Sequence, residues 1–310
     1  MDAVIRTVGL TKTFRHPLFP WLVRARAVRD LSIEVLRGEV FALLGPNGSG
    51  KSTTIKLVLG LLRPTSGEAR VFGEAPQSLR VKRRIGYLPE ESWLYPYLTP
   101  DEVLDYFGRL FGIARAERRR RIDALLDLVG LTRQRRRAIG EFSKGMQRRV
   151  ALAQCLINSP DLIFLDEPTS GLDAIGIAEV KDLIRRLRAL GKTVVLSSHR
   201  MADVEDVCDR LTILYGGRSR VSGPIQELVE ADNLRQITAA LDDDTVQAIL
   251  DLIHERAGAE REVVVAPARE RLESFFLRVV NDARREQAET SGAEDSKVAG
   301  LDFLTDGRSE

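Results

Sequence analysis

The sequence predicts an α/β fold built on parallel strands, and three observations predict it. An apolar strand at residues 39–44 runs into a glycine-rich loop and then into a helical pattern at residues 50–62. Residues 162–165 form a continuous apolar run, which is typical of a strand buried on both faces. A second helical pattern, at residues 178–190, follows that run before the next short strand. Strands that alternate with helices in this way indicate a parallel sheet.

Further strands and one irregular segment flank this pattern. Residues 4–10, 31–35 and 211–215 are short and apolar, and we expect three more strands there. The segment at residues 15–30 carries two prolines and several arginines, so we expect a hairpin tip or an exposed loop. Its aromatic stretch, residues 16–23, fits a partner contact and a plain surface insertion equally well.

The middle of the sequence is helical. Thr99 and Asp101 are expected to cap a helix with apolar residues from Val103 to Leu110, and a second helix is expected at residues 118–128. We interpret the many arginines of this region as a solvated helix face rather than a surface for nucleic acid or lipid headgroups. We predict an inserted helical subdomain at about residues 91–158.

The chain is expected to have three parts. Residues 1–228 form the α/β body with its helical insertion. Residues 229–284 read as a small α+β appendage in the order strand, helix, strand, helix, with its first helix at residues 245–255. Residues 285–310 are polar, small and acidic, and are expected to be disordered.

Composition excludes several classes of protein. A formal net charge of +2 argues against a nucleic-acid binder that relies on bulk charge. The two cysteines, Cys155 and Cys208, form no CxxC pair, so a reducing cytoplasm fits better than a disulfide framework or a zinc site. The N-terminus has no secretion pattern, and no stretch reaches the roughly 18 apolar residues that span a bilayer. A partner would have to supply any membrane spans.

One motif predicts a site for a nucleoside triphosphate. The pattern G-x-x-x-x-G-K-[ST] lies between the strand at residues 39–44 and the helix at residues 50–62. Its glycines let backbone N–H groups curl around a phosphate, and the helix directs its N-terminus at the anion. Lysine can reach the terminal phosphates, and the serine hydroxyl can bind Mg²⁺. The motif consists of Gly45, Pro46, Asn47, Gly48, Ser49, Gly50, Lys51 and Ser52.

Acidic residues follow the apolar run at residues 162–165. Asp166 stands where a buried strand can project a carboxylate toward Mg²⁺ at the phosphate loop. Glu167 is placed to polarise an attacking water as general base. His199 comes after the next strand, at the carboxyl end of a sheet strand, where ligands bind in α/β proteins.

At this point the sequence closely resembles the ABC ATPase family, a branch of the P-loop NTPases. The resemblance covers about residues 3–228 and is carried, in order, by the stretches GPNGSGKST, GYLPE, FSKGMQRR, LIFLDEPTSGLD and LSSH. It implies a P-loop NTPase fold with a mixed sheet, an inserted helical subdomain and a small C-terminal α+β appendage.

The resemblance also implies roles for residues. Residues 45–53, including Thr53, resemble the Walker A loop, which binds ATP, and Lys51 within that loop is expected to be a catalytic residue as well. Asp166 resembles the magnesium-organising acid of Walker B, Glu167 the catalytic glutamate and His199 the histidine that senses the γ-phosphate. Residues 170–173 resemble the D-loop, which touches a partner subunit.

Three further assignments come from the resemblance. Phe14 is similar to the aromatic residue that stacks on adenine. Ser143 and Gly145 match the ABC signature, usually LSGGQ, whereas Phe142, Lys144 and Met146 depart from it. Glu90 stands where the Q-loop usually has glutamine, and its carboxylate could reach Mg²⁺ or water, although it only accepts hydrogen bonds.

The resemblance implies a mechanism shared by two chains. Ser143 of one subunit would complete the ATP site built on Lys51 of another, so that two ATP molecules lie in a head-to-tail dimer. Glu167 would orient the attacking water, and hydrolysis would let the dimer open. A homodimer is the simplest expectation.

Three features resemble the exporter-type branch with separate membrane subunits: Glu90, the FSKGM stretch, and LESFFLRVV at residues 272–280. They imply an integral membrane permease as partner, export as the direction, and a peripheral location at the cytoplasmic face of the cell membrane. We expect no nucleic-acid partner.

Two alternatives remain open. A soluble ABC ATPase of translation or DNA repair usually has tandem ATPase domains or long coiled coils, whereas this chain has one Walker A motif and no sustained heptads. A regulatory module that binds ATP without turnover is disfavoured by Glu167. Measured turnover of the purified protein separates these alternatives.

Overall fold

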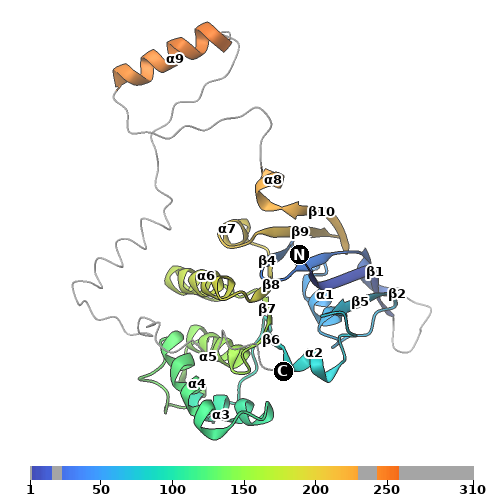
Figure 1. Cartoon of the computed structure of the whole chain (residues 1–310), viewed down its shortest axis with the longest axis vertical. Helices are drawn as coiled ribbons and strands as arrows, with labels where there is room; N and C mark the ends of the chain where they lie inside the picture. The colour runs from blue at the N-terminus through green and yellow to red at the C-terminus, as the bar shows by residue number, and fades with distance from the viewer. Residues whose placement is uncertain (1, 16–22, 230–242, 258–310) are drawn as a thin grey trace. The chain divides into compact units, whose positions relative to one another are not determined.

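The computed structural model describes residues 2–15, 23–229 and 243–257 (Figure 1). The chain divides into two compact units. The first includes Met1–Val229, and the second is Glu230–Thr290. Within the second unit the described residues form one helix, α9 (Asp243–Ala257), where a helix was predicted at residues 245–255. The other elements predicted for the appendage, and the C-terminal tail, lie outside the described residues.

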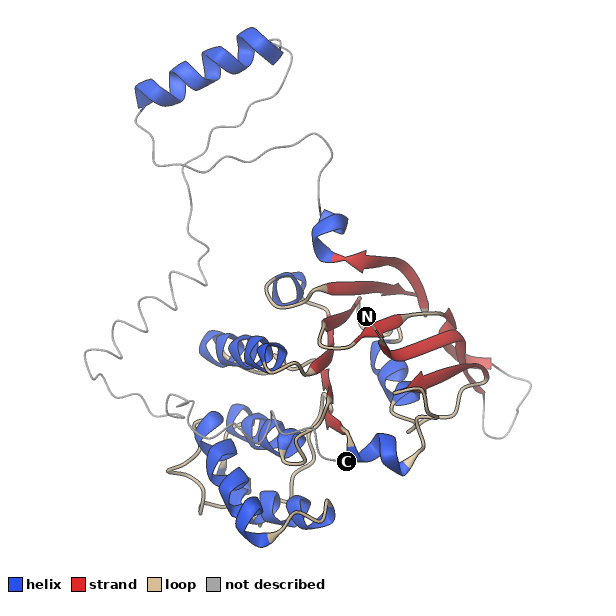
Figure 2. Ribbon diagram, in the orientation of Figure 1, coloured by secondary structure: helices blue, strands red, loops and turns tan. Residues whose placement is uncertain are grey.

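A six-stranded sheet is the centre of the first unit (Figure 2). Its strand order is β10-β9-β4-β8-β7-β6, with β4, β6, β7, β8 and β9 parallel and β10 antiparallel to β9. This arrangement confirms the predicted α/β class with a mixed sheet. The strands are β4 (Val40–Leu44), β6 (Ile85–Leu88), β7 (Leu162–Asp166), β8 (Thr193–Ser198), β9 (Arg210–Tyr215) and β10 (Arg218–Pro224).

A second, antiparallel sheet contains β1 (Ala3–Arg15), which pairs with β2 (Val23–Leu31), β3 (Glu34–Leu36) and β5 (Ser66–Val71). The strand predicted at residues 31–35 is wrong as a single element, because it is interrupted between β2 and β3, where the Ile33 N–H donates to the Thr7 hydroxyl. The hairpin tip or exposed loop expected over residues 15–30 is wrong for residues 23–30, which belong to β2 and pair with β1. Residues 16–22 lie outside the described part. Arginines that alternate with small residues in VRARAVR concealed β2, because Arg is not a typical strand residue.

Helices cover the larger sheet. They are α1 (Lys51–Val58), α2 (Leu79–Arg83), α3 (Pro100–Leu110), α4 (Arg115–Leu128), α5 (Lys144–Leu156), α6 (Ala174–Ala189), α7 (Met201–Glu205) and α8 (Ile225–Val229), with a 3-10 turn at Ile139–Glu141. The helix predicted at residues 50–62 ends early, because Gly60 adopts φ +67°, a left-handed conformation that terminates helices. Helices α3, α4 and α5 lie in the stretch predicted as an inserted subdomain, between β6 and β7.

The cap of α3 follows the prediction. Thr99 Oγ1 accepts a hydrogen bond from the Glu102 N–H, and a Glu102 carboxylate oxygen accepts from the Thr99 N–H at 2.8 Å. This reciprocal capping box satisfies two of the free N–H groups at the helix start. Asp101 is instead an ion-pair partner of Arg135, at 2.7 Å.

Two apolar cores lie on opposite faces of the large sheet. Strand alternation sends Phe41 and Phe164 into the core shared with α1 and the antiparallel sheet. Ala42 and Ile163 point into the core shared with α3 to α6. Both faces are therefore covered, as the continuous apolar run at residues 162–165 predicted. Within the described ranges, no helix has the length and apolarity needed to cross a bilayer.

Candidate nucleotide-binding site

The predicted phosphate loop connects β4 to α1 at the carboxyl end of β4. A Cβ atom on Gly45 would lie 2.3 Å from the Leu214 carbonyl oxygen, so this position has room only for glycine. Gly50 adopts φ +107°, and a Cβ there would lie 2.3 Å from the Ala27 carbonyl oxygen. The close packing holds the loop, including Pro46, Asn47, Gly48 and Ser49, directly before α1. Helix N-termini with free N–H groups attract phosphate.

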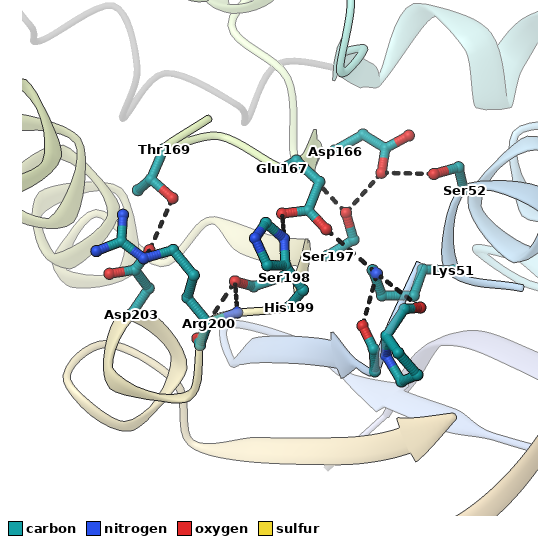
Figure 3. A network of polar contacts seen from close by, with 12 residues as sticks. Lys51, Ser52, Asp166, Glu167, Thr169, Ser197, Ser198, His199, Arg200 and Asp203 are labelled. Carbon is teal, nitrogen blue, oxygen red and sulfur yellow. Dashed lines mark hydrogen bonds and ion pairs between the residues drawn. The ribbon is translucent and has the colours of Figure 1, made fainter. Parts of the chain in front are cut away.

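Lys51 and Ser52, in the first turn of α1, contact the two acids at the end of β7 (Figure 3). Lys51 Nζ donates to the Gly45 carbonyl at 2.7 Å and lies 3.2 Å from Glu167 Oε1. Ser52 Oγ donates to Asp166 Oδ1 at 3.1 Å. Residues more than a hundred positions apart are thus joined at one edge of the sheet, because β4 and β7 are parallel and end on the same side. Thr53 follows in the same turn of α1.

The Lys51–Glu167 pair is almost completely buried. Both side chains are 6% exposed, and Glu167 Oε1 accepts no hydrogen bond from the described residues, although the Lys51 ammonium is within ion-pair distance. Such a pair depends on Coulomb attraction in a poorly solvated space. An incoming phosphate carries more negative charge than one carboxylate, so it can compete with Glu167 for Lys51.

His199 contacts the same carboxylate from the end of β8. Its Nδ1 lies 2.8 Å from Glu167 Oε2, a hydrogen bond in which the imidazole N–H donates to the carboxylate. The His199 side chain is 49% exposed, whereas Glu167 is buried. The structure therefore brings together all three residues predicted as catalytic, Lys51, Glu167 and His199.

Ser197, on β8, is a residue that motif analysis missed. Its hydroxyl donates to Asp166 Oδ1 at 2.5 Å and accepts from the Glu167 N–H at 2.9 Å. Ser197 is fully buried and lies opposite Asp166 in the parallel pairing of β7 and β8. The signal for it was the polar pair Ser197-Ser198 at the end of an otherwise apolar strand.

The oxygen atoms of Ser52 and Asp166 form a pair that suits a hard cation. A hydroxyl and a carboxylate are the ligands that Mg²⁺ uses together with phosphate oxygens. Burial, and after it the charge of Asp166, raises the pKa of Tyr87 on β6 to about 12, so its hydroxyl stays protonated near the acids. Glu90, the third predicted metal residue, is exposed, and its carboxylate makes no polar contact with Ser52 or Asp166 in the described chain.

The predicted signature lies elsewhere in the unit. Ser143 caps α5, because its hydroxyl accepts from the Met146 N–H at 3.3 Å. Gly145 follows in the first turn of α5 and would bring an added Cβ only within ordinary contact of Leu172. Among the described residues, no hydrogen bond or ion pair joins Ser143 or Gly145 to the loop at residues 45–52. The structure does not bring the signature and the phosphate loop together within one chain.

The last predicted nucleotide contact is Phe14, on β1. Its ring is 36% exposed, and Lys12 Nζ lies 5.3 Å from the ring centroid. Phe14 is thus partly exposed, on the antiparallel sheet rather than on the sheet that carries the acids.

A network of polar contacts joins the segment after Glu167, which includes the predicted D-loop, to helices α6 and α7. Thr169 Oγ1 donates to Asp203 Oδ2 at 2.7 Å (Figure 3). Lys181 Nζ lies 3.3 Å from Asp203 Oδ1. Asp173 caps α6 by accepting from the Gly176 N–H at 2.8 Å. The segment after Glu167 is thus attached to α6 and α7.

Comparisons with known proteins agree with this geometry. A family described as ABC transporter matches residues 28–170. An uncharacterized ABC transporter ATP-binding protein of Synechocystis is 43% identical over 74% of this chain, and the match spans 65% of that protein. A fluoroquinolones export ATP-binding protein of Mycobacterium tuberculosis is 42% identical over 76% of this chain and 75% of its own length.

A solved structure has the same fold. It is the dimeric, post-hydrolysis state of an ATP-binding cassette bound to ADP and Pi, with a TM-score of 0.64 and 27% identity. The alignment covers 71% of this chain and 98% of that one. Fold, motifs and relatives lead to one conclusion: the chain belongs to the ATP-binding proteins of ABC transporters, a family of ATPases.

Proposed function

We propose that this chain hydrolyses Mg²⁺-ATP at the site formed by Lys51, Ser52, Asp166, Glu167 and His199, in order to drive export through a separate membrane subunit. The observation that carries the proposal is the convergence of these side chains at one edge of the sheet. A phosphate-binding loop, a pair of oxygen ligands and a buried carboxylate are the parts that phosphoryl transfer requires.

The chain's own residues have separable tasks. The N–H groups of residues 47–51 and Lys51 Nζ bind the β- and γ-phosphates. Glu167 accepts a proton from water as the water oxygen bonds to the γ-phosphorus, and the bond to the bridging oxygen breaks to release ADP. His199 holds the carboxylate of Glu167 and contacts the γ-phosphate from the end of β8.

The Mg²⁺ ion would be held by Ser52 Oγ and Asp166 Oδ1. It would neutralise charge that develops on the phosphate oxygens. Ser197 orients Asp166 for this role, since its hydroxyl fixes one carboxylate oxygen. The exposed Glu90 is a candidate for an additional ligand on the solvent side.

A second copy would complete the site. Ser143 and Gly145 have no polar contact with the phosphate loop of their own chain, and the N-terminus of α5 is suited to an anion. In a homodimer, the N-terminus of α5 of one copy would lie against the γ-phosphate bound by the other copy. Two ATP molecules would then be enclosed between the two copies.

The membrane subunit would dock beside residues 93–97. Trp93 is 90% exposed and Tyr97 is 73% exposed, and Tyr95 between them is also exposed. Neighbouring exposed aromatic side chains are unusual on a free surface and common at the centre of protein interfaces. The relatives' export function favours a permease over the soluble alternatives, and it implies a peripheral location at the cytoplasmic membrane face.

Capture from native membranes tests the proposal. Tagged Glu167→Gln protein with ATP is expected to retain a stoichiometric polytopic membrane protein from detergent-solubilised membranes. Adding Trp93→Ala and Tyr97→Ala should abolish this capture, whereas Leu79→Ala, at another exposed apolar side chain, should not. Recovery of only ribosomal or DNA-associated proteins would contradict the transport function.

A further inference from the structure

A buried arginine of α5 reaches the catalytic edge. Arg148 lies in the second turn of α5, five residues after Ser143, and is 7% exposed. Its Nη1 donates to the carbonyl oxygens of Pro89 and Glu90, the latter at 2.9 Å, and to Ser92 Oγ at 3.3 Å. One guanidinium nitrogen therefore holds the segment at residues 89–92.

The other terminal nitrogen holds the backbone at the acids. Arg148 Nη2 donates to the carbonyl oxygen of Asp166 at 2.8 Å and to that of Glu167 at 3.0 Å. Segments separated by more than seventy residues, 89–92 and 166–167, are thus joined through a single side chain.

These contacts require an arginine. All the acceptors that Arg148 finds are carbonyl or hydroxyl oxygens, and burial lowers its pKa from the usual value without removing its charge. Hydrogen bonds from a charged donor are stronger than neutral ones. A planar guanidinium can serve two segments at once, whereas the single ammonium of a lysine cannot hold both in the same geometry.

Glu167 depends on such support. Its backbone has φ +47°, a left-handed conformation that a non-glycine residue adopts only when its surroundings enforce it. Three hydrogen bonds hold this conformation. The Glu167 N–H donates to Ser197 Oγ, and the Glu167 carbonyl oxygen accepts from Arg148 Nη2 and from the Ser170 N–H. Loss of the Arg148 bond would let the backbone relax and would turn the carboxylate away from Lys51 and His199.

We propose that Arg148 is a positioning residue for ATP hydrolysis, which fixes the backbone of Glu167 and ties it to residues 89–92 so that the two segments move together. The proposal rests on the proposed role of Glu167 as the base. Because Trp93 and Tyr97 follow the tied segment directly, a partner bound there would act on Glu167 through Arg148.

Steady-state kinetics test the first part. With purified full-length chain, Arg148→Lys is expected to lower kcat by roughly 10- to 100-fold, as a misplaced general base does, and to leave the KM for ATP within about threefold. Arg149→Lys is the matched control. Arg149 is the next residue of α5, and it contacts the Val129 carbonyl and Glu179, away from the acids. The kcat of the Arg149→Lys protein should stay within about threefold of the wild-type value.

Fluorescence tests the second part. The chain has two tryptophans, Trp21 and Trp93, so Trp21→Phe leaves Trp93 as a reporter beside Ser92. ATP should shift the Trp93 emission in this background. Addition of Arg148→Lys should reduce the shift severalfold, while equilibrium dialysis with labelled ATP shows unchanged binding. Ser92→Ala, which removes one of the five bonds, should reduce it less.

The outcomes separate the two proposals. If Arg148→Lys keeps wild-type kcat, or if it and Arg149→Lys lose activity and melting temperature equally, the positioning role is wrong. An absent ATP-dependent Trp93 shift in the Trp21→Phe protein overturns the coupling even if an Arg148 variant fails to fold. Normal turnover in Glu167→Gln would instead contradict the proposed function.

Discussion

The two polar regions of the nucleotide-binding unit differ in how complete they are. At the carboxyl edge of the large sheet, Lys51, Ser52, Asp166, Glu167 and His199 are joined by hydrogen bonds and an ion pair. At the start of α5, Ser143 has its own helix as its hydrogen-bond partner. The first region is organised within one chain, whereas the second is a helix N-terminus with no contact to the phosphate loop among the described residues. This difference is the reason for proposing a site divided between two copies.

The largest effect is expected at the carboxyl edge of the large sheet, where the polar residues are joined within one chain. Glu167→Gln keeps the shape of the side chain but cannot accept a proton, so kcat should fall by about 10²- to 10⁴-fold. ATP binding should persist, because Lys51 is released from its buried ion pair with Glu167. A coupled phosphate-release assay and equilibrium dialysis measure the two quantities. Lys51→Ala, in contrast, should lose ATP binding itself, and retention of binding there would remove Lys51 from the site.

Substitution at the start of α5 should separate ATP binding from ATP turnover. Ser143→Arg places a bulky side chain at the start of α5, and turnover should fall by about 10²-fold or more because the helix N-terminus can no longer approach a phosphate. The Kd for ATP of the dilute, single chain should stay within about threefold, since Ser143 has no contact with its own phosphate loop. A large change of that Kd would place Ser143 in the site of its own chain.

A smaller effect is expected at Ser197, whose hydroxyl is hydrogen-bonded to both acids. Ser197→Ala removes one hydrogen bond from Asp166 Oδ1 and leaves the Glu167 N–H unpaired. Kcat should fall by about 10-fold, and the free energy of unfolding should fall by about 1–3 kcal/mol because a buried donor loses its partner. Activity assays and urea unfolding measure these changes. Unchanged kcat would show that the orientation of Asp166 does not depend on Ser197.

The smallest effect is expected at Thr169, whose hydroxyl donates to Asp203. Thr169→Val is nearly isosteric and removes the hydrogen bond to Asp203 Oδ2, while Lys181 still balances the charge of Asp203. The free energy of unfolding should fall by about 1–2 kcal/mol, with kcat within about threefold of wild type. A loss of kcat as large as that of Ser197→Ala would mean that this network also positions the acids.

The complete region was largely predictable from sequence. The phosphate loop and the acids at the end of β7 are contiguous motifs, and parallel strands that end on one side bring them together. The α/β class and the Thr99 cap followed from equally local patterns. Strand β2 did not, because arginines interrupt its apolar pattern.

The residues that support the acids were not predictable. Ser197 is 31 positions from Asp166, and Arg148 is 59 positions from Pro89. Their roles depend on the order of the strands in the sheet and on the packing of α5 against that sheet. In the sequence, Ser197 is one of two adjacent serines and Arg148 is one of two adjacent arginines, and only tertiary packing distinguishes each from its neighbour.

The divided site is tested most directly by the mass of the ATP-bound protein. Glu167→Gln protein, with ATP and Mg²⁺, is measured by size-exclusion chromatography with light scattering, beside the same protein that also carries Ser143→Arg. We expect the mass of a dimer for Glu167→Gln and of a monomer for the double variant, although both bind ATP. A monomer for Glu167→Gln with bound ATP, or a dimer that survives Ser143→Arg, would contradict the account.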